Sequence, residues 1–506
     1  MNPRDLFVDQ AIDGLLPAEL GAVSRDSRTV LAGEAFIAQT DGVEGDQHIA
    51  EALARGAATV LAERRTPNAE RRTGAMTPHA RWAFARASCA AHRLPPPFPV
   101  LAVTGTKGKS TVAHVTQAAL GPGAARIGTI GWHDGVSERP NPQTTPPPDE
   151  LHRFLAGLPA SCPGVAMEAS SHGLDQHRLA GLRLAGLAVT NIGRDHLDYH
   201  GSTAAYVHAK LRAARLLVAG GACVINTDDE HAGVFAHAAQ CAGARVIALG
   251  IGRGGHPRQP GCDTANVFRD GPAWRLDAPG AEVDLPVRLP GGFNAWNVAA
   301  AVLLAEAAGV ALPLAAERIA DAPPVPGRLE LLARAPLTYV DYAHTPESLA
   351  LAIAALREAH PDRRLAVVFG CGGDRDNGKR APMGAAAAVA DVVVLTDDNP
   401  RSEDPAAIVR DISAGFRSPE VRKSGSPEVL IEHDRGRAIV SARSAIGPDG
   451  VVVVAGKGHE TEQKFRDRTI TWDDRAFVRT LADFRTSGLP DLRTSCGSPA
   501  ADQADP

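Results

Sequence analysis

Val100-Leu101-Ala102-Val103-Thr104-Gly105-Thr106-Lys107-Gly108-Lys109-Ser110-Thr111 is the stretch that decides the fold of this chain. Its apolar residues predict a short buried strand, a glycine-bearing turn follows, and residues 112–120 are good helix formers. Glycines let backbone N–H groups surround phosphate oxygens, Lys109 can reach the β- and γ-phosphates, and Ser110 can ligate Mg²⁺. Val103 stands where the full pattern has its first glycine, so a plain turn before a helix opening at Thr111 remains an alternative. The stretch predicts a loop that binds a nucleoside triphosphate.

Length and composition indicate an ordinary globular protein of about three domains. The chain has 506 residues, 44% of them hydrophobic, and a net charge of -5, which favours no nucleic-acid partner. No apolar run is long enough to span a bilayer and residues 1–10 are acidic and polar, so we expect a cytoplasmic protein without a membrane partner. Seven scattered cysteines without CxxC spacing favour reduced thiols over a zinc site or a disulfide framework.

Proline-rich segments at 93–97 and 323–327 predict the domain boundaries. We expect an α/β protein with a small N-terminal domain at 1–95, a central parallel-sheet domain of the P-loop ATPase kind at 96–326, and a Rossmann-like domain at 327–487. In the first domain, strands near 35–38 and 60–62 flank a helix that follows Asp46-Gln47-His48. Residues 488–506 are rich in Ser, Pro, Ala and Asp, which predicts a disordered tail.

Polar clusters follow several predicted strands where each strand ends. Glu168 ends the strand at 164–167 and could hold Mg²⁺, although a strand-end glutamate is often simply solvated. Residues 191–200 follow the strand at 187–190, and Asn294 stands at the start of an apolar helix, where it could instead be a helix cap. Strands at 337–340, 365–369, 392–395 and 451–455 each end in polar residues, which we expect to form one site at the same sheet edge.

Together, the loop at 104–110 and the polar residues that follow the predicted strands resemble the motifs of the Mur ligases of peptidoglycan synthesis. Within this family they resemble the MurE type, and the resemblance covers about residues 20–475. The resemblance implies that ATP phosphorylates the free D-Glu carboxylate of UDP-MurNAc-L-Ala-D-Glu, and that an amine attacks the acyl phosphate through a tetrahedral intermediate. It further implies Mg²⁺, ATP as a substrate, meso-diaminopimelate as the added amino acid, and a monomer. The matching blocks are 104–110, 167–173, 191–200, 293–297, 327–330, 341–346, 370–376 and 456–460.

The resemblance also assigns roles to individual residues. The implied catalytic residues are Lys109, Glu168, His196, Lys210 and Arg328. The implied ATP contacts are Thr104, Gly105, Thr106, Lys107, Gly108, Lys109, Ser110, Asn294 and Asp341. The implied contacts to the UDP-linked muramoyl dipeptide are Ser27, Thr144, Thr145, Ser170, Gln176 and Arg178. The implied diaminopimelate contacts are Arg375, Asp398, Asn399, Pro400, Arg401, Gly456 and Glu460. The implied metal ligands are Ser110, Glu168, His196 and Lys210, the last as a carbamate.

Lys210 matches the family lysine that is carbamylated by CO₂, which would turn an ammonium into a ligand for a hard cation. The alternative is an ordinary lysine on a helix surface. Lys107 and Gln143 depart from the asparagines usual in the family, which casts doubt on Gln143 as a muramoyl contact, and residues 40–45 align too poorly to assign.

Three other functions stay open. The same ligation could use L-lysine, although Arg401 would then lack the distal carboxylate of diaminopimelate as its partner. A folylpolyglutamate synthetase shares the ATP site, but it has no use for a UDP-binding domain of about 95 residues. Outside enzymes, the chain could be a nucleotide-binding regulatory protein that has lost catalysis.

Overall fold

A computed structural model describes residues 16–40, 42–63, 74–77, 79–141, 143–252, 260–417 and 427–483. The N-terminal segment 1–10 and the expected tail at 488–506 therefore lie outside the described residues. Contacts divide the chain into two units, Met1–Arg288 with Gly292–Val325 and Leu289–Gly291 with Pro326–Pro506. No helix in the described ranges is long and apolar enough to cross a membrane.

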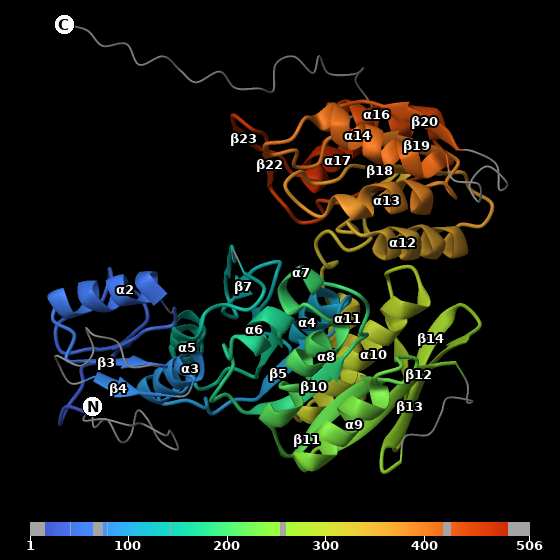
Figure 1. The fold of residues 1–506 in the computed structure, drawn as a ribbon. Coiled ribbons are helices and arrows are strands. Elements are labelled where there is room, and N and C mark those ends of the chain that lie inside the picture. The colour runs from blue at the N-terminus through green and yellow to red at the C-terminus, as the bar shows by residue number, and fades with distance from the viewer. Residues whose placement is uncertain are drawn as a thin grey trace, which may run out of the picture. The chain divides into compact units, whose positions relative to one another are not determined.

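The first unit begins with a small parallel sheet, drawn in blue in Figure 1. Alternation along its strands sends Ala35, Ile37 and Leu61 to one core cluster with Phe84, and Phe36 and its neighbours to a second cluster on the other face. Helix α2 begins at Gly42, several residues before its expected start after His48. The elements are β1 (Val23–Ser24), β2 (Ala35–Ile37), α2 (Gly42–Ala54), β3 (Thr59–Ala62), β4 (Gly74–Met76) and α3 (Ala80–Ala91).

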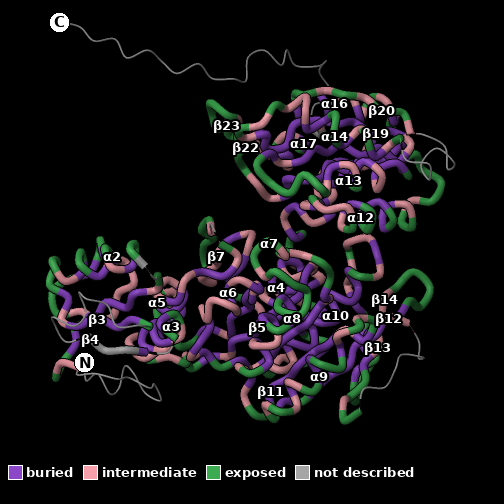
Figure 2. The backbone as a smooth tube through the Cα atoms, in the orientation of Figure 1, coloured by how far each residue is buried: buried purple, intermediate pink, exposed green. Residues whose placement is uncertain are grey.

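The same unit contains an eleven-stranded sheet in the order β15-β14-β13-β12-β11-β10-β5-β9-β6-β7-β8. Its centre is parallel, as predicted, and the strands there are buried (Figure 2). Both ends turn antiparallel, which was not predicted. The strands are β5 (Val100–Thr104), β6 (Ala125–Ile127), β7 (Trp132–His133), β8 (Glu138–Arg139), β9 (Val165–Glu168), β10 (Leu184–Val189), β11 (Leu217–Asn226), β12 (Arg245–Ile251), β13 (Asp263–Asp270), β14 (Ala273–Ala278) and β15 (Ala281–Leu285).

Helices from the connections cover this sheet. The hydrophobic core joins β5, β9 and β10 to side chains of α5, α8 and α9, such as Leu151, Tyr206 and Phe235. Helix α4 packs against α10 and α11. The helices are α4 (Lys109–Leu120), α5 (Pro148–Gly157), α6 (Ser171–Asp175), α7 (Leu197–His200), α8 (Thr203–Leu211), η1 (Ala214–Leu216), α9 (Ala232–Cys241), α10 (Gly292–Ala307) and α11 (Leu312–Asp321).

The second unit is built on a six-stranded sheet in the order β16-β17-β21-β18-β19-β20, parallel except for β16. One face packs on α12, α13 and α14, and the other packs on α16 and α17. The predicted strands at 365–369, 392–395 and 451–455 are observed at those positions. The elements are β16 (Glu330–Arg334), β17 (Leu337–Asp341), α12 (Pro346–Ala359), β18 (Leu365–Phe369), η2 (Asn377–Lys379), α13 (Arg380–Ala387), β19 (Val392–Leu395), α14 (Pro405–Ser413), η3 (Ala414–Arg417), β20 (Glu428–Ile431), α16 (Arg435–Ile446), β21 (Val451–Ala455), β22 (Glu462–Lys464), β23 (Thr469–Thr471) and α17 (Asp474–Asp483).

Candidate active site

The glycine-bearing loop between β5 and α4 is shaped by two close approaches. Gly105 has φ +141° and a Cβ there would lie 1.9 Å from Thr190 Oγ1, while Gly108 has φ +88° and a Cβ there would lie 2.8 Å from Asn297 Oδ1. Both positions therefore require glycine. Helix α4 begins at Lys109, two residues before the expected start at Thr111, so the helix N-terminus directly follows the loop. The main-chain N–H groups of the loop and the helix start are suited to an anion.

The end of β10 holds the backbone of this loop. Thr106 N donates to Asn191 O at 2.6 Å, and Lys107 N donates to Asn191 Oδ1 at 3.1 Å. Lys107 O accepts from Thr190 Oγ1 at 2.5 Å and from Asn191 Nδ2 at 3.1 Å. Lys109 Nζ donates to the carbonyls of Gly105 and Thr106, both at 2.9 Å, so its charge lies over the loop.

Ser110 and Glu168 meet beneath the loop, as the sequence predicts. Glu168 is 2% exposed and its Oε2 accepts from Ser110 Oγ at 3.1 Å and from Thr129 Oγ1 at 3.2 Å. Its Oε1 accepts from Thr129 N at 2.7 Å, which fixes the carboxylate. A hydroxyl and a carboxylate suit Mg²⁺, which retains waters for the rest of its shell. Across the described ranges, no group of three or more His, Cys, Asp or Glu side chains could hold a metal.

Lys210 lies against the same loop from α8. It is 1% exposed, its Nζ donates to Gly105 O at 2.6 Å, and the Nζ lies 4.6 Å from the centre of the Tyr206 ring. Burial lowers the pKa of Lys210 well below its ordinary value, the charge of Lys109 lowers it further, and Asp195 acts in the opposite direction. The alternative of an ordinary lysine on a helix surface is therefore wrong.

His196 is less closely tied to this cluster. It is half-exposed, it has φ +51°, and its ring packs edge-on against His172 at 4.7 Å between centroids. Among the described residues, it forms no hydrogen bond or ion pair with Glu168 or Lys210. The structure thus brings together three of the four implied metal-site residues around the loop and leaves His196 at its edge.

Four of the implied muramoyl contacts, Thr145, Ser170, Gln176 and Arg178, are linked by hydrogen bonds. Arg178 donates through Nη1 to Thr145 O at 2.5 Å and through Nη2 to Gln176 Oε1 at 2.7 Å, and it also contacts Gln143. Thr145 Oγ1 accepts from Ser170 N at 3.0 Å and donates to the main-chain carbonyl of Glu168 at 2.8 Å, which connects these residues to the end of β9.

Three further implied contacts have protein partners. Ser27 is buried and its Oγ donates to Glu51 Oε2 on α2 at 2.6 Å. Thr144 Oγ1 lies 2.9 Å from Thr129 Oγ1. Asn294 is buried and accepts from Asn297 Nδ2 at 3.2 Å. Because α10 begins at Gly292, Asn294 is inside the helix and does not cap it.

In the second unit, Arg328 lies just before β16, and Asp341 is the last residue of the neighbouring strand β17. Asp341 Oδ2 accepts from Leu329 N at 2.7 Å and its Oδ1 accepts from Ala343 N at 2.8 Å. Burial raises the pKa of Asp341, although the charge of Arg328 opposes this shift. The Arg328 guanidinium lies 4.7 Å from the centre of the Tyr342 ring.

The ends of β19 and β21 carry a compact polar cluster. Asn399 Nδ2 donates to Asp398 Oδ1 at 3.0 Å and to Glu460 Oε2 at 3.1 Å. Lys457, which is fully buried, donates to Asn399 Oδ1 at 3.2 Å and to Glu460 Oε2 at 3.1 Å. Gly456 has φ +109°, and a Cβ there would lie 2.6 Å from Asp398 Oδ2. These strand ends meet as the sequence predicts. Lys457, within the block at 456–460, was not predicted to take part in the cluster.

Two arginines flank this cluster on loops. Arg401 follows the buried Pro400, has φ +51°, and donates through Nη1 to Gly373 O at 2.5 Å. Arg375 is exposed on the loop after β18. Of the two, only Arg401 is held against the protein.

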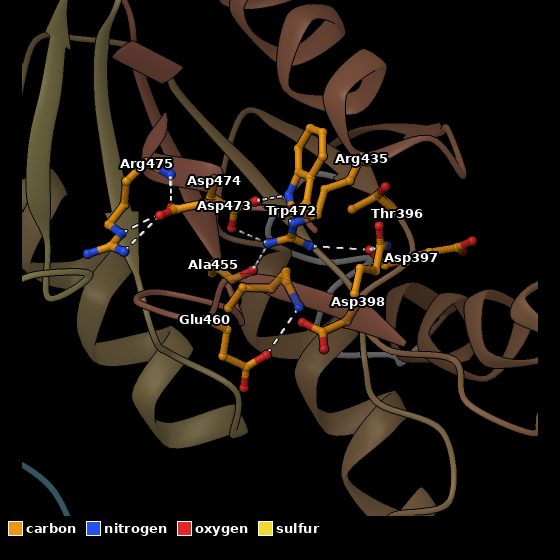
Figure 3. A network of polar contacts seen from close by, with 12 residues as sticks. Thr396, Asp397, Asp398, Arg435, Ala455, Glu460, Trp472, Asp473, Asp474 and Arg475 are labelled. Carbon is orange, nitrogen blue, oxygen red and sulfur yellow. Dashed lines mark hydrogen bonds and ion pairs between the residues drawn. The ribbon is translucent and has the colours of Figure 1, made fainter. Parts of the chain in front are cut away.

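A buried ion pair lies behind the cluster (Figure 3). Arg435 Nε donates to Asp474 Oδ1 at 2.7 Å and its Nη2 donates to Asp474 Oδ2 at 2.8 Å, and both side chains are 0% exposed. Arg435 also donates to Ala455 O at 2.9 Å and to Asp397 O at 3.4 Å, and Trp472 Nε1 donates to Asp474 Oδ1 at 2.8 Å. The pair therefore connects the ends of β19 and β21. No local sequence pattern separates Arg435 from the exposed Arg437, so the sequence offered no signal for it.

Comparisons with known proteins agree with this geometry. A model of the Mur ligase middle domain matches residues 103–305, and one of the Mur ligase glutamate ligase domain matches residues 327–458. A relative from Alkalilimnicola ehrlichii, named UDP-N-acetylmuramoyl-L-alanyl-D-glutamate--2,6-diaminopimelate ligase, is 41% identical, over 92% of this chain and 95% of its own length. A Brucella melitensis protein of the same name is 40% identical, over 91% of this chain and 93% of its own.

Solved structures extend the match to the fold. A structure of a ligase with the same name has a TM-score of 0.67 and 30% identity, and the match covers 96% of this chain and 99% of the other. A Mycobacterium tuberculosis folylpolyglutamate synthase complexed with ADP has a TM-score of 0.55 at 20% identity over 75% of this chain and 92% of its own, and it shares the fold alone. This chain is therefore a member of the Mur ligase family of ATP-dependent ligases, and within the family it belongs to the MurE type.

Proposed function

We propose that this chain joins meso-diaminopimelate to the free D-Glu carboxylate of UDP-MurNAc-L-Ala-D-Glu at the expense of ATP. The observation that carries the proposal is the cluster of Asp398, Asn399 and Glu460 beside Arg401, in a chain that matches relatives named for diaminopimelate over nearly their whole length. A ligase needs this acceptor pocket in addition to its ATP site, and the cluster provides polar groups of both signs for an amino acid.

The proposed ATP contacts rest on the charge of Lys109 and on the position of the loop at the start of α4. Lys109 and the N–H groups of residues 105–110 would bind the β- and γ-phosphates, while Thr104 ends the strand that carries them. Ser110 and Glu168 would hold Mg²⁺, which neutralises charge on the transferred phosphoryl group when bound. The carboxylate attacks the γ-phosphorus, ADP leaves, and the acyl phosphate that results is then open to the amine.

Lys210 is proposed to carry the carbamate. Its buried amine has a lowered pKa, so the neutral form that attacks CO₂ is favoured. The nitrogen forms a bond to the carbon of CO₂ while one C=O π bond opens to a C–O⁻ group. The nitrogen then loses a proton to solvent, so a neutral side chain becomes an anion. When present, the carbamate would supply oxygen ligands to a hard cation next to the loop.

Arg401 is proposed to select the acceptor. Its guanidinium would pair with the carboxylate at the far end of diaminopimelate, and L-lysine lacks this carboxylate. Arg375, Pro400 and Gly456 would complete the pocket. A site whose guanidinium is left without its carboxylate partner rejects the smaller substrate strongly.

The remaining roles are proposals from the family. His196 would bind a second cation, Asn294 would contact adenine, and Arg328 and Asp341 would contact phosphate and ribose. Ser27, Thr144, Thr145, Ser170, Gln176 and Arg178 would hold the UDP-linked substrate. We also propose a cytoplasmic monomer in which residues 1–95, 96–326 and 327–487 bind the UDP substrate, ATP and the amino acid respectively.

Phosphate release by the purified full chain tests the assignment. The protein is supplied with Mg²⁺-ATP and UDP-MurNAc-L-Ala-D-Glu, with either meso-diaminopimelate or L-lysine, and the product is identified by mass spectrometry. Lys109→Ala serves as the inactive control. Turnover with diaminopimelate alone is expected. Turnover with L-lysine alone would keep the ligase and overturn the proposed role of Arg401, and turnover with neither would reject the ligase itself.

A further inference from the structure

A cavity of about 790 Å³ lies in the first unit between α3 and the segment that runs from α6 to η1. Cavities that bind small molecules in proteins are typically of this size. No residue assigned above to ATP, metal, the UDP-linked substrate or the amino acid lines it. The cavity is therefore a feature that the proposed ligation does not use.

The lining of this cavity is strongly cationic. It includes four arginines and three histidines but no Asp or Glu, namely Arg86, Arg183, Arg212, Arg215, His79, His177 and His208. Within the described part of the chain, Arg183 and Arg215 form no hydrogen bond or ion pair. Arg212 is held in place, because it donates to Asp175 O at 2.8 Å and lies 3.4 Å from Asp175 Oδ1. Even with Asp175 counted, the arginines leave an excess positive charge in one concave place, where low-dielectric walls strengthen its field.

The histidine beside Arg212 adds a neutral polar group. His177 Nε2 lies 3.1 Å from Arg212 Nη1, and burial together with the Arg212 charge lowers the pKa of His177 to about 4. His177 has φ +56° and lines the cavity, whereas the next residue, Arg178, donates to Gln176 and Thr145. The two consecutive residues therefore belong to different sites: His177 lines the cavity, and Arg178 belongs to the proposed muramoyl site.

The rest of the lining is apolar. Leu174, Leu179 and Leu182 are buried around it, and Trp82 of α3 contributes an aromatic ring. We infer that this cavity is a binding site for an organic anion, with the arginines holding a carboxylate, sulfonate or phosphate group and the leucines and Trp82 covering an apolar body. Neither part of the lining alone would select such a ligand: a plain inorganic anion would leave the apolar walls uncovered, and a neutral hydrocarbon would leave Arg183 and Arg215 without an anionic partner.

Fluorescence titration of the full chain with 8-anilinonaphthalene-1-sulfonate tests this inference, because the probe is an anion with an aromatic body. The test variant is Arg183→Glu/Arg215→Glu, and both arginines are exposed enough for the fold to tolerate the change. The matched control is Arg139→Glu/Arg437→Glu, which makes the same charge change at exposed positions elsewhere. The neutral N-phenyl-1-naphthylamine is titrated in parallel.

We expect saturable binding of one sulfonate probe per chain, weakened at least tenfold in the test variant and less than twofold in the control. Affinity for the neutral probe should change less than twofold in both. Equal sulfonate binding by the test variant and the unaltered chain would overturn the inference, as would a neutral probe that binds as tightly as the sulfonate. On the unaltered protein, decanoate should displace the sulfonate probe and 1-decanol should not, and the reverse order would also overturn it. Because ligation is measured separately, failure here leaves the proposed function untouched.

Discussion

Replacing Arg435 by Met should destabilise the second unit severely. The substitution leaves the Asp474 carboxylate buried at 0% exposure without its cationic partner, and it removes the donors to Ala455 O and Asp397 O. Removing one member of a buried ion pair costs about 3–5 kcal/mol. The double variant Arg435→Met/Asp474→Leu removes the stranded charge, so we expect it to recover roughly 2 kcal/mol of that loss, since buried groups that lose only a hydrogen bond cost about 1–3 kcal/mol each.

Hydrogen exchange read by mass spectrometry resolves this effect on β21 (Val451–Ala455) without interference from the first unit. A loss of about 3–5 kcal/mol in the stability of the second unit, at about 1.4 kcal/mol per factor of ten, should make amide exchange in β21 roughly 100-fold to more than 1,000-fold faster. Arg437→Met on the same helix is the matched control, because Arg437 is exposed, and it should change exchange less than threefold.

The stability that the Arg435–Asp474 pair contributes should also depend on pH. Burial alone would raise the pKa of Asp474, but the charge of Arg435 and the hydrogen bonds from Arg435 and Trp472 lower it below its usual 3.8. In the native chain, the stability from this pair is therefore present above pH 3.8 and lost as pH falls through the lower folded pKa. In Arg435→Met, burial acts without that charge, so protonation becomes easier and the destabilisation should shrink as pH falls from 7 towards 4. Exchange rates equal to those of the native chain, or a penalty that grows as pH falls, would refute this account.

The other predictions concern turnover. Lys210→Ala should lose more than a hundredfold in kcat and keep its affinity for the UDP-linked substrate by calorimetry, and near-normal turnover would remove the carbamate. Glu168→Gln should need at least tenfold more Mg²⁺ for half-maximal rate, because the carboxylate beside Ser110 loses its charge; an unchanged Mg²⁺ titration would argue against this metal site. Arg401→Lys should lower kcat/KM for meso-diaminopimelate roughly a hundredfold through loss of a bidentate pair, whereas an equal kcat/KM would place the distal carboxylate elsewhere.

Local patterns were enough to predict the centres of both large sheets. The apolar strands around Val103 and Val453 are continuous runs followed by glycine, and such runs are typical of parallel strands buried on both faces. The antiparallel edge formed by β7 and β8 was missed because these strands have two residues each, too few to show alternation. Helix α2 begins at Gly42, and glycine has a poor helix propensity, so its start was predicted too late.

The candidate site was predictable where side chains directly follow a strand or a loop. Glu168 and Asp398 are of this kind, because the end of a parallel strand fixes their place. Lys457 and Arg435 are different, since a buried cation is recognised only through partners distant in sequence, such as Asp474. Figure 3 shows this pairing across separate elements, which no window of neighbouring residues contains.

The hydrogen bonds between the loop at 105–108 and residues Thr190 and Asn191 have a thermodynamic consequence. A loop that becomes ordered only around its ligand loses conformational entropy at that moment, about 1–2 kcal/mol for each residue fixed. Here β10 has already ordered the loop during folding, so nucleotide binding is relieved of that entropy loss. The entropy of nucleotide binding should then come mainly from released water and ions. Weakening the hydrogen bonds between Asn191 and the loop should make the binding entropy more unfavourable at a nearly constant binding enthalpy.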